Sequence, residues 1–222
     1  MRGVLIFSGG VDSTTLLYKM LADGYEVAAI TFNYAQRHKK EIASAKAIAK
    51  RLDITHQVVD LSSLASLLGD SALLVGKEVP SCHYTEEAAK KTVVPNRNMI
   101  MLSVAAGYAE AHEIPEVFYA AHKNDSTIYP DCRPEFVQAL RPAIRLATAW
   151  HPVELQAPFV DMSKAEIVRM GLSLQVPYEL TWSCYKGEEK PCRTCPTCIE
   201  REEAFALNGC RDPLVEDGNY SA

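Results

Sequence analysis

Cysteine is the residue type whose spacing in this chain most clearly predicts chemistry. Four of the seven cysteines lie within 15 residues, at Cys184, Cys192, Cys195 and Cys198. Their two C-x2-C spacings bring thiolates to one centre, and four thiolates are the usual ligands of a closed, tetrahedral Zn²⁺ site. An iron–sulfur cluster is the alternative, because short C-x2-C repeats also hold such clusters. A closed zinc site is expected to stabilise the fold rather than to activate water.

The remaining cysteines argue against a disulfide framework. Cys82, Cys132 and Cys210 stand alone and the total is odd, whereas disulfide-stapled domains are short and secreted. Clustered thiols indicate a reducing compartment, and the apolar run at residues 4–7 is too short for a signal peptide. We therefore expect a cytoplasmic protein. No apolar run approaches the ~20 residues that span a bilayer, so no membrane partner is expected.

Glycines, hydroxyls and an aspartate directly follow that apolar run. Residues 8–15 read Ser-Gly-Gly-Val-Asp-Ser-Thr-Thr and open a predicted helix. Glycine lets the backbone approach a ligand closely, and free N–H groups at a helix start favour a phosphate. Asp12 is expected to cap the helix or to hold Mg²⁺. A Walker loop is excluded because no lysine follows Gly10. The structural alternative is a glycine turn with a Ser or Asp cap.

The predicted nucleotide-binding segment includes the end of the strand and the first helical turns. Its residues are Phe7, Ser8, Gly9, Gly10, Val11, Asp12, Ser13, Thr14, Thr15, Leu16 and Leu17.

Lys164 lies in the first turn of another predicted helix. Ser163 and Glu166 form the spacing of a capping box, which places Lys164 just after the N-cap. The helix dipole mildly disfavours a cation at this position, so the lysine is better explained if it faces a phosphate. A solvated lysine is the alternative.

The elements that must position these residues alternate between strand and helix. Apolar runs predict buried strands at residues 4–7, 27–32, 56–60 and 116–121. Periodic apolar positions predict helices at residues 13–21, 38–51, 61–68, 97–111 and 134–148, the last kinked or broken at Pro142. Loops are predicted at 69–95 and 122–130. This order predicts an α/β fold, an open, Rossmann-like parallel sheet with helices on both faces.

Composition sets the domain organisation and excludes some partners. With 222 residues, 48% of them hydrophobic, the chain suits one α/β domain over residues 1–183 and a small zinc-binding lobe over residues 184–222. The net charge of −5 predicts no direct nucleic-acid partner. The basic run at residues 37–40 is either a local patch or a solvated helix start.

In its strand–loop–helix context, the octet at residues 8–15 resembles the pyrophosphate-binding loop, or PP-loop, of the ATP pyrophosphatase superfamily. This resemblance implies an adenine nucleotide alpha hydrolase-like fold and cleavage of ATP between the α and β phosphates. A carboxylate or carbonyl oxygen would be adenylated, and AMP would then leave as a nucleophile attacks.

Across nearly its whole length the chain resembles the 7-cyano-7-deazaguanine synthase family. The matching stretches are residues 7–17, 34–41, 94–98, 120–135, 162–167, 183–198 and 208–213. The resemblance implies ATP-dependent conversion of 7-carboxy-7-deazaguanine and ammonia to the nitrile, through an adenylated carboxylate and an adenylated amide. It also implies Mg²⁺ with ATP, zinc on the four clustered cysteines, a homodimer, and a place in making queuosine or archaeosine precursors for tRNA modification.

The roles of individual residues are hypotheses at this stage. The predicted catalytic residues are Ser8, Asp12, Ser13, Lys164 and Arg97. Arg97 is the first choice for a carboxylate or phosphate, because its guanidinium pairs with either in a bidentate manner; a structural salt bridge is the alternative. The predicted substrate-binding residues are Tyr34, Arg97, His122, Asp125, Asp131, Arg133 and Glu135. Asp131 and Glu135 would accept hydrogen bonds from a guanine-like edge, Tyr34 or Tyr129 would stack on a base, and capping could explain several of these.

Three positions depart from the glycines usual in this family. They are Ala35, Asn96 and Arg193. Asn tolerates left-handed backbone geometry, whereas Arg193 is less comfortable between two metal ligands. These departures leave open an altered substrate or acceptor.

Other functions remain possible on these residues. One is a related PP-loop enzyme that uses another carboxylate, a different amine or a tRNA acceptor. The rival from a different class is a non-catalytic zinc-binding interaction module, which the intact octet and Lys164 argue against.

Overall fold

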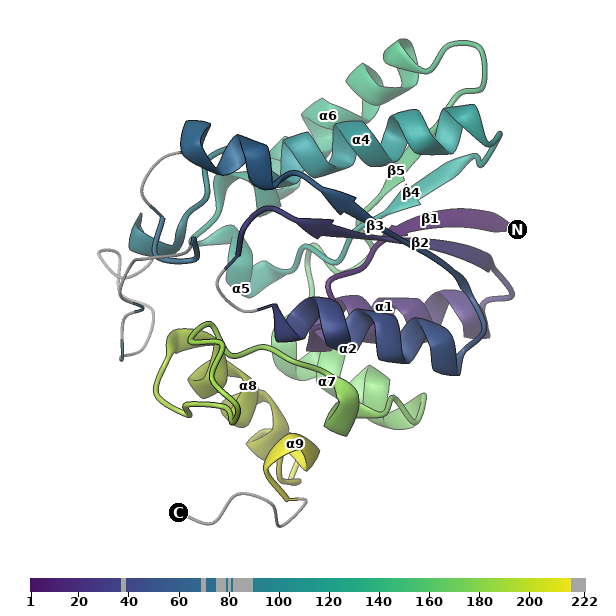
Figure 1. The fold of residues 1–222 in the computed structure, drawn as a ribbon. Helices are drawn as coiled ribbons and strands as arrows, with labels where there is room; N and C mark the ends of the chain where they lie inside the picture. The colour runs from purple at the N-terminus through teal and green to yellow at the C-terminus, as the bar shows by residue number, and fades with distance from the viewer. Residues whose placement is uncertain (37–38, 69–70, 75–78, 80, 82–89, 217–222) are drawn as a thin grey trace.

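The computed structural model describes residues 1–36, 39–68, 71–74, 79, 81 and 90–216 (Figure 1). Its strands are β1 (Arg2–Ile6), β2 (Glu26–Asn33), β3 (Thr55–Asp60), β4 (Glu116–Phe118) and β5 (Glu154–Gln156). Its α-helices are α1 (Val11–Ala22), α2 (Lys40–Arg51), α4 (Arg97–Ala111), α5 (Lys123–Ser126), α6 (Pro134–Ala147), α7 (Lys164–Ser173), α8 (Pro196–Ala206) and α9 (Pro213–Glu216). Short 3-10 turns cover Ser62–Leu67, Pro130–Cys132 and Tyr178–Leu180.

The five strands form one parallel sheet in the order β3-β2-β1-β4-β5. The chain moves outward from β1 to β3 and then returns to the other side of β1, where β4 and β5 pair. The order therefore reverses between β1 and β4. Ligands of open parallel sheets bind beyond the carboxyl ends of the strands at such a reversal.

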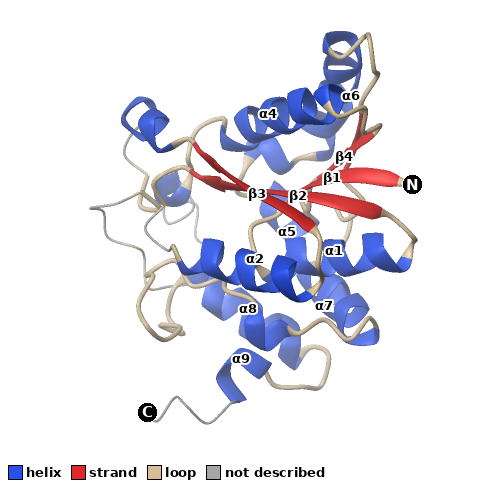
Figure 2. Cartoon of the chain, turned by 45° about the vertical axis from the view of Figure 1, so that its right-hand side comes forward, coloured by secondary structure: helices blue, strands red, loops and turns tan. Residues whose placement is uncertain are grey.

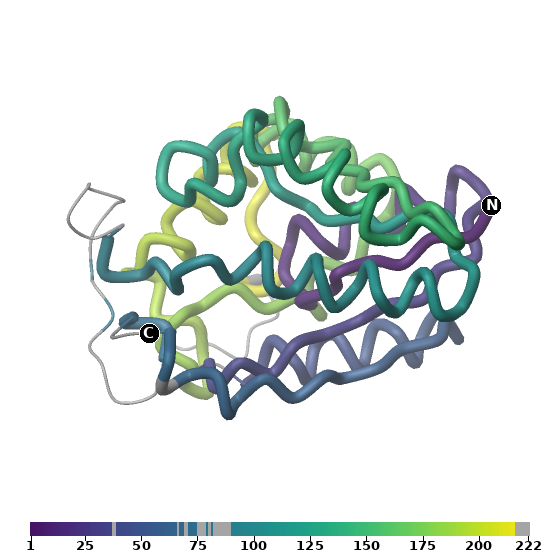
Figure 3. Tube along the Cα trace, turned by 90° about the horizontal axis from the view of Figure 1, so that it is seen from above, coloured from purple at the N-terminus to yellow at the C-terminus, as the bar shows by residue number. Residues whose placement is uncertain are grey.

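Helices cover both faces of the sheet, as the sequence predicted (Figure 2). Helices α4 and α6 lie over one face (Figure 3), while α1, α2 and α7 lie below the other. Alternate strand residues enter two separate cores because both faces are buried: Val4 packs with Leu102 of α4, whereas Leu5 packs with Leu16 of α1.

The predicted elements are found, with shifts at their ends. Helix α4 has the predicted bounds, and the described part of the predicted helix at 38–51 is α2. Helix α6 continues through Pro142 without a break. Several expectations were wrong in detail. The loop expected at 122–130 contains the short helix α5, and the helix expected at 61–68 is the 3-10 turn Ser62–Leu67. Strand β4 stops at Phe118 instead of residue 121, and residues 119–121, of which Tyr119 keeps one hydrogen bond to β5, line a cavity. Strand β5 was not predicted, since three residues carry no readable alternation.

The segment after residue 183 packs on the α1 and α7 side of the sheet through α8 (Figure 1). Phe205 of α8 shares a buried cluster with Val168 of α7 and Val11 of α1. The buried Arg201 guanidinium donates to both carboxylate oxygens of Asp212, over 2.7 and 2.8 Å. The Phe205 cluster attaches the cysteine-rich segment to α1 and α7, whereas the Arg201–Asp212 pair joins two parts of that segment.

All three residues that stand at family glycine positions adopt left-handed backbone. Ala35, Asn96 and Arg193 have φ of 62°, 58° and 58°. Only glycine, and to a lesser degree Asn, adopts this region without a steric cost. The backbone geometry of these turns is thus the one a glycine would favour, although the side chains differ.

We expect Ala35→Gly to stabilise the protein. Glycine removes the steric strain of a left-handed alanine, and this gain in free energy exceeds the cost of the extra conformational entropy that glycine gives the unfolded chain. The free energy of unfolding should therefore rise by about 0.5–1 kcal/mol. Urea unfolding measures it. The reciprocal control is Gly24→Ala, because Gly24 has φ of 83° and open space around its Cβ position. An unfolding midpoint that Ala35→Gly leaves unchanged or lowers would contradict the strain argument.

No described helix is long and apolar enough to cross a membrane.

Candidate active site and metal centre

A cavity of about 210 Å³ lies where the strand order reverses, beyond the carboxyl ends of β1, β2 and β4. Of the predicted site residues, it is lined by Phe7, Ser8, Gly10, Val11, Asp12, Ser13, Tyr34, Arg97, Asp125 and Lys164. These come from segments far apart in the sequence. The cavity unites the predicted phosphate loop, Lys164 and Arg97.

The loop between β1 and α1 is held in shape by its own hydroxyls. The Ser8 and Ser13 hydroxyl oxygens lie 2.9 Å apart, and the Gly10 amide donates to Ser8 Oγ over 3.2 Å. No side chain caps the start of α1, so Asp12 is not the cap that the sequence offered as one alternative. Uncapped N–H groups at the start of a helix favour an anion.

Glycine is required at position 9 by close packing. Gly9 has φ of 82°, and a Cβ there would lie 2.6 Å from the Glu41 carbonyl oxygen and the Ala45 amide nitrogen of α2. The Gly9 carbonyl accepts a hydrogen bond from the Trp182 amide over 3.0 Å. The loop is therefore fixed between α2 and the segment that leads into the cysteine cluster.

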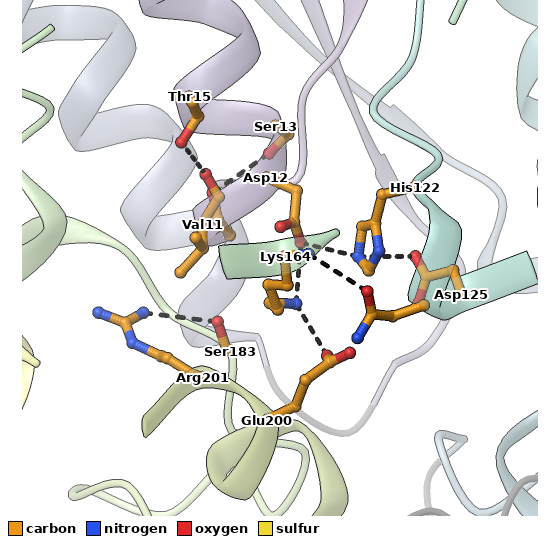
Figure 4. A network of polar contacts seen from close by, with 12 residues as sticks. Val11, Asp12, Ser13, Thr15, His122, Asp125, Lys164, Ser183, Glu200 and Arg201 are labelled. Atoms are coloured by element: carbon orange, nitrogen blue, oxygen red, sulfur yellow. Dashed lines mark hydrogen bonds and ion pairs between the residues drawn. The ribbon is translucent and has the colours of Figure 1, made fainter. Parts of the chain in front are cut away.

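Lys164 is buried and faces carboxylates (Figure 4). Its Nζ donates to Asp12 Oδ2 over 3.1 Å and to Glu200 Oε2 over 3.0 Å. Burial opposes the ammonium charge, but Asp12 and Glu200 raise the pKa of Lys164 above its usual range. Burial also opposes the charge on Asp12, yet Lys164 and His122 keep the pKa of Asp12 well below its usual range. The solvated lysine of the alternative hypothesis is excluded.

His122 extends this polar network, although it does not line the cavity. Its Nε2 lies 3.2 Å from Asp125 Oδ2 and 3.6 Å from Asp12 Oδ2. Burial alone would lower its pKa, but the two carboxylates raise the pKa of His122 to about 9. His122 therefore carries positive charge at neutral pH and helps Lys164 balance the carboxylates.

Arg97 stands at the start of α4 between two tyrosine rings. Its guanidinium carbon lies 5.5 Å from the Tyr34 ring centroid and 5.8 Å from that of Tyr129. Its Nη1 also donates to the Tyr34 hydroxyl over 3.3 Å. Among the described residues no carboxylate forms an ion pair with Arg97, so the salt-bridge alternative is not supported. Within the described part of the chain, the Tyr34 hydroxyl is the only hydrogen-bond acceptor of the guanidinium, which leaves most of its N–H groups for an anion.

Besides His122, three other predicted substrate residues do not line the cavity. Asp131 accepts a hydrogen bond from the Asn98 amide in the first turn of α4 over 2.8 Å. Arg133 donates to the Ser126 carbonyl over 3.1 Å, and Glu135 is exposed on the first turn of α6. Asp131 thus acts as a cap in this structure.

Sequence reasoning missed several residues that line the cavity. They are Thr31, Gln36, Glu41, Asn98, Tyr119, Trp182, Ser183, Tyr185, Thr197 and Glu200. Glu200 is the most informative, because it pairs with Lys164 from a helix that begins at the cysteine cluster. The only available signal was the i, i+3 spacing of Thr197 and Glu200 on one helical face.

The four clustered cysteines form a compact group. The sulfurs of Cys184, Cys192, Cys195 and Cys198 all lie within 4.8 Å of one another, and three of the four residues are buried. A tetrahedral ion with metal–sulfur bonds near 2.3 Å would place its sulfurs roughly 3.8 Å apart, so the set fits a metal ion. The Cys192 and Cys195 amides donate to Cys184 Sγ and Cys192 Sγ, each over 3.3 Å, which orients the thiolates.

The left-handed Arg193 lies in the turn between Cys192 and Cys195. Its guanidinium donates to both carboxylate oxygens of Glu202 over 2.9 and 3.2 Å. The turn is therefore compatible with arginine. Of the isolated cysteines, Cys132 is buried in the cavity wall and Cys210 is half-buried, whereas Cys82 and the basic residues 37–38 lie outside the described residues.

Comparison with known proteins identifies close relatives over nearly the whole chain. The sequence model of the family described as "Queuosine biosynthesis protein QueC" matches residues 2–209. The 7-cyano-7-deazaguanine synthase of Archaeoglobus fulgidus is 57% identical over 220 residues, covering 99% of this chain and 92% of that protein. The enzyme of the same name from Methanoregula boonei is 51% identical over 214 residues, covering 96% and 98%.

Among solved structures, NMN synthetase from Francisella tularensis has the same fold. Its TM-score is 0.51 at 13% identity, covering 94% of this chain and 77% of that chain. At this identity the likeness shows the α/β fold alone.

Proposed function

This chain belongs to the family of the queuosine biosynthesis protein QueC, and from that membership we infer that it is an ATP-dependent enzyme that makes 7-cyano-7-deazaguanine. The substrate is 7-carboxy-7-deazaguanine, and ammonia supplies the nitrogen. The observation that carries this conclusion is the match over residues 2–209, together with one cavity that holds the phosphate loop, Lys164 and Arg97.

The reaction needs two activations because a carboxylate is a poor electrophile. A carboxylate oxygen attacks the α-phosphorus of ATP, pyrophosphate leaves, and ammonia displaces AMP to give the amide. The amide oxygen then attacks a second ATP, and loss of AMP with the amide protons leaves the nitrile. Each step builds negative charge on phosphate oxygens, which preorganised donors and cations stabilise.

We assign the phosphates to the loop between β1 and α1. The uncapped start of α1 supplies N–H donors, and Ser8 and Ser13 supply hydroxyls. Lys164 would exchange its carboxylate partners for a phosphate oxygen when the nucleotide binds. Tyr34 and Arg97 would face the substrate, with the guanidinium pairing with the carboxylate.

Asp12 fits a magnesium ion that arrives with ATP. Its Oδ1 is buried and has no hydrogen-bond partner among the described residues. Mg²⁺ prefers such carboxylate oxygens and usually shares them with substrate phosphates. When bound, the ion would neutralise charge on the phosphates. His122, which lies between the Asp12 and Asp125 carboxylates, would hold the Asp12 carboxylate in place.

One incubation tests the proposed reaction. Purified protein is mixed with 7-carboxy-7-deazaguanine, Mg-ATP and ammonium, and mass spectrometry follows the nitrile, the amide and AMP. We expect two AMP for each nitrile and no nitrile without ammonium. Release of ADP in place of AMP, or the absence of both the nitrile and AMP, would refute the proposal.

We propose that the metal of the cysteine cluster is zinc and that it holds the fold. Four thiolates fill a tetrahedral shell and leave no position for substrate. We also propose that residues 184–222 form a lobe packed on a domain of residues 1–183. We further propose that the protein is a cytoplasmic homodimer. Its product would feed queuosine or archaeosine synthesis, and the protein itself would not contact nucleic acid directly.

We expect Cys195→Ser to remove most of the bound metal and to lower the melting temperature. The buried Cys195 is both a candidate ligand and the N-cap of α8, so losing the metal should loosen that helix. Metal content is measured by inductively coupled plasma mass spectrometry. We expect about one zinc ion per wild-type chain. The matched control is Cys210→Ser, outside the cluster. Iron with visible charge-transfer absorption would instead support the iron–sulfur alternative.

A further inference from the structure

One buried hydroxyl of the cavity wall has no role in the assignments above. Tyr119 follows β4 directly, is 5% exposed and lines the cavity. Its hydroxyl oxygen has no hydrogen-bond partner among the described residues. Native proteins rarely leave a buried hydroxyl unpaired, and each exception calls for an explanation. Since this residue borders the cavity, a ligand is the natural partner.

The position of Tyr119 in the cavity indicates which ligand its hydroxyl would contact. Its backbone amide still bonds to the Gln156 carbonyl of β5 over 3.1 Å, so the residue is held by the sheet. Its side chain packs in the core under α4 and α6, with Met101 of α4. The phosphate loop leads into α1, which packs against the opposite face. Tyr119 therefore lies at the Arg97 end of the cavity, and not at the end formed by the helix start that would hold the phosphates.

The surroundings of Tyr119 suit a flat heterocycle with hydrogen-bonding edges. Arg97, Asn98, Met101 and Cys132 line the same cavity. The Asn98 amide group donates to Cys132 Sγ over 3.1 Å, so both side chains are already engaged. Burial raises the pKa of the Tyr119 hydroxyl above its usual range, as do the nearby Cys132 and Asp131. The hydroxyl thus keeps its proton and is able to donate it in a hydrogen bond.

We propose that the Tyr119 hydroxyl donates a hydrogen bond to an acceptor on the 7-carboxy-7-deazaguanine ring and so selects this substrate, with the ring's carboxylate facing Arg97. The proposal rests on the proposed function and adds a specificity residue to it. A donor at this depth rejects a ring that presents no acceptor, because the hydroxyl would again be left without a partner.

Tyr119→Phe removes the oxygen and little else. The KM and the calorimetric Kd for 7-carboxy-7-deazaguanine should rise about 10-fold to 100-fold, as expected when a buried hydrogen bond to a ligand is lost. The KM for ATP and the kcat should stay within about 2-fold, since the interaction serves binding alone. The melting temperature of the ligand-free variant should be equal to or above that of the wild type, because the hydroxyl has no partner in the protein.

Tyr25→Phe is the matched control. The Tyr25 hydroxyl donates to Glu116 Oε2 over 2.9 Å near the opposite end of the sheet, so its loss should change neither KM. The melting temperature tells the two variants apart, because Tyr25→Phe removes an existing hydrogen bond and Tyr119→Phe does not.

Four results would overturn the proposal. An unchanged KM for the acid with a lower melting temperature would show that the hydroxyl is structural. A rise in the KM for ATP alone would assign the hydroxyl to the nucleotide. A wild-type protein that neither binds nor converts the acid would overturn the proposed function as well. If the wild type turns over normally and Tyr119→Phe has the same KM and Kd for the acid, only this inference is overturned.

Discussion

Replacing Lys164 by methionine is expected to lower kcat by about 10²-fold to 10³-fold, the usual loss when one preorganised charge donor to a transition state is removed. The Nζ atom lies 3.1 Å from Asp12 Oδ2 in the cavity, beside the helix start assigned to phosphate. Methionine keeps the length and apolar stem of the side chain and removes only the cation. AMP release under saturating substrates measures the effect.

The same substitution removes the cation that pairs with both Asp12 and Glu200. Asp12 and Glu200 would then lie in a mostly buried site with His122 as the remaining positive group. Loss of one partner from a buried ion pair costs about 3–5 kcal/mol of stability. The assay is therefore run at a temperature where circular dichroism shows Lys164→Met fully folded, so that lost turnover reports chemistry.

Lys19→Met is the control for Lys164→Met. Lys19 pairs with Asp23 over 2.6 Å, but both side chains are partly exposed. Exposed pairs contribute about 0–1 kcal/mol, so this variant should keep both stability and turnover. If Lys164→Met kept kcat within about 3-fold of the wild type, the assignment of Lys164 to phosphate would be wrong.

Replacing Arg201 by methionine is expected to reduce the free energy of unfolding by about 3–5 kcal/mol. The two side chains of the Arg201–Asp212 pair are only 3% and 4% exposed. The guanidinium also donates to Thr181 Oγ1 over 2.8 Å and to the Tyr178 carbonyl over 3.0 Å. Without it, Asp212 would be left as a buried carboxylate with no paired cation, and Thr181 Oγ1 and the Tyr178 carbonyl would each lose one donor.

The loss should lower the melting temperature by about 10 °C for a chain of this size. Scanning calorimetry measures it, and the double variant Arg201→Met with Asp212→Leu should recover part of the loss because no charge is left buried. Arg193→Met provides the control, since Arg193 forms a similar pair with Glu202 but its side chain is 61% exposed. Equal effects of Arg193→Met and Arg201→Met would contradict the role of burial.

Local signals in the sequence were sufficient for the elements and for two motifs. The octet at residues 8–15 lies at the junction of β1 and α1, and the capping box of Ser163 and Glu166 is present at the start of α7. The four clustered cysteines have their sulfurs together. In each case neighbours in sequence are neighbours in space, so spacing alone determined the geometry.

Tertiary structure alone decided which distant groups meet. Lys164 and Asp12 are 152 residues apart yet share a hydrogen bond, and Glu200 joins them from a helix whose sequence has no catalytic motif. Asp131, which suited a guanine edge, caps α4 instead, while Tyr119 of the expected strand lines the cavity. These outcomes depend on the reversal of strand order between β1 and β4. That reversal brings the carboxyl ends of separate strands to one place, and no local pattern of residue types encodes it.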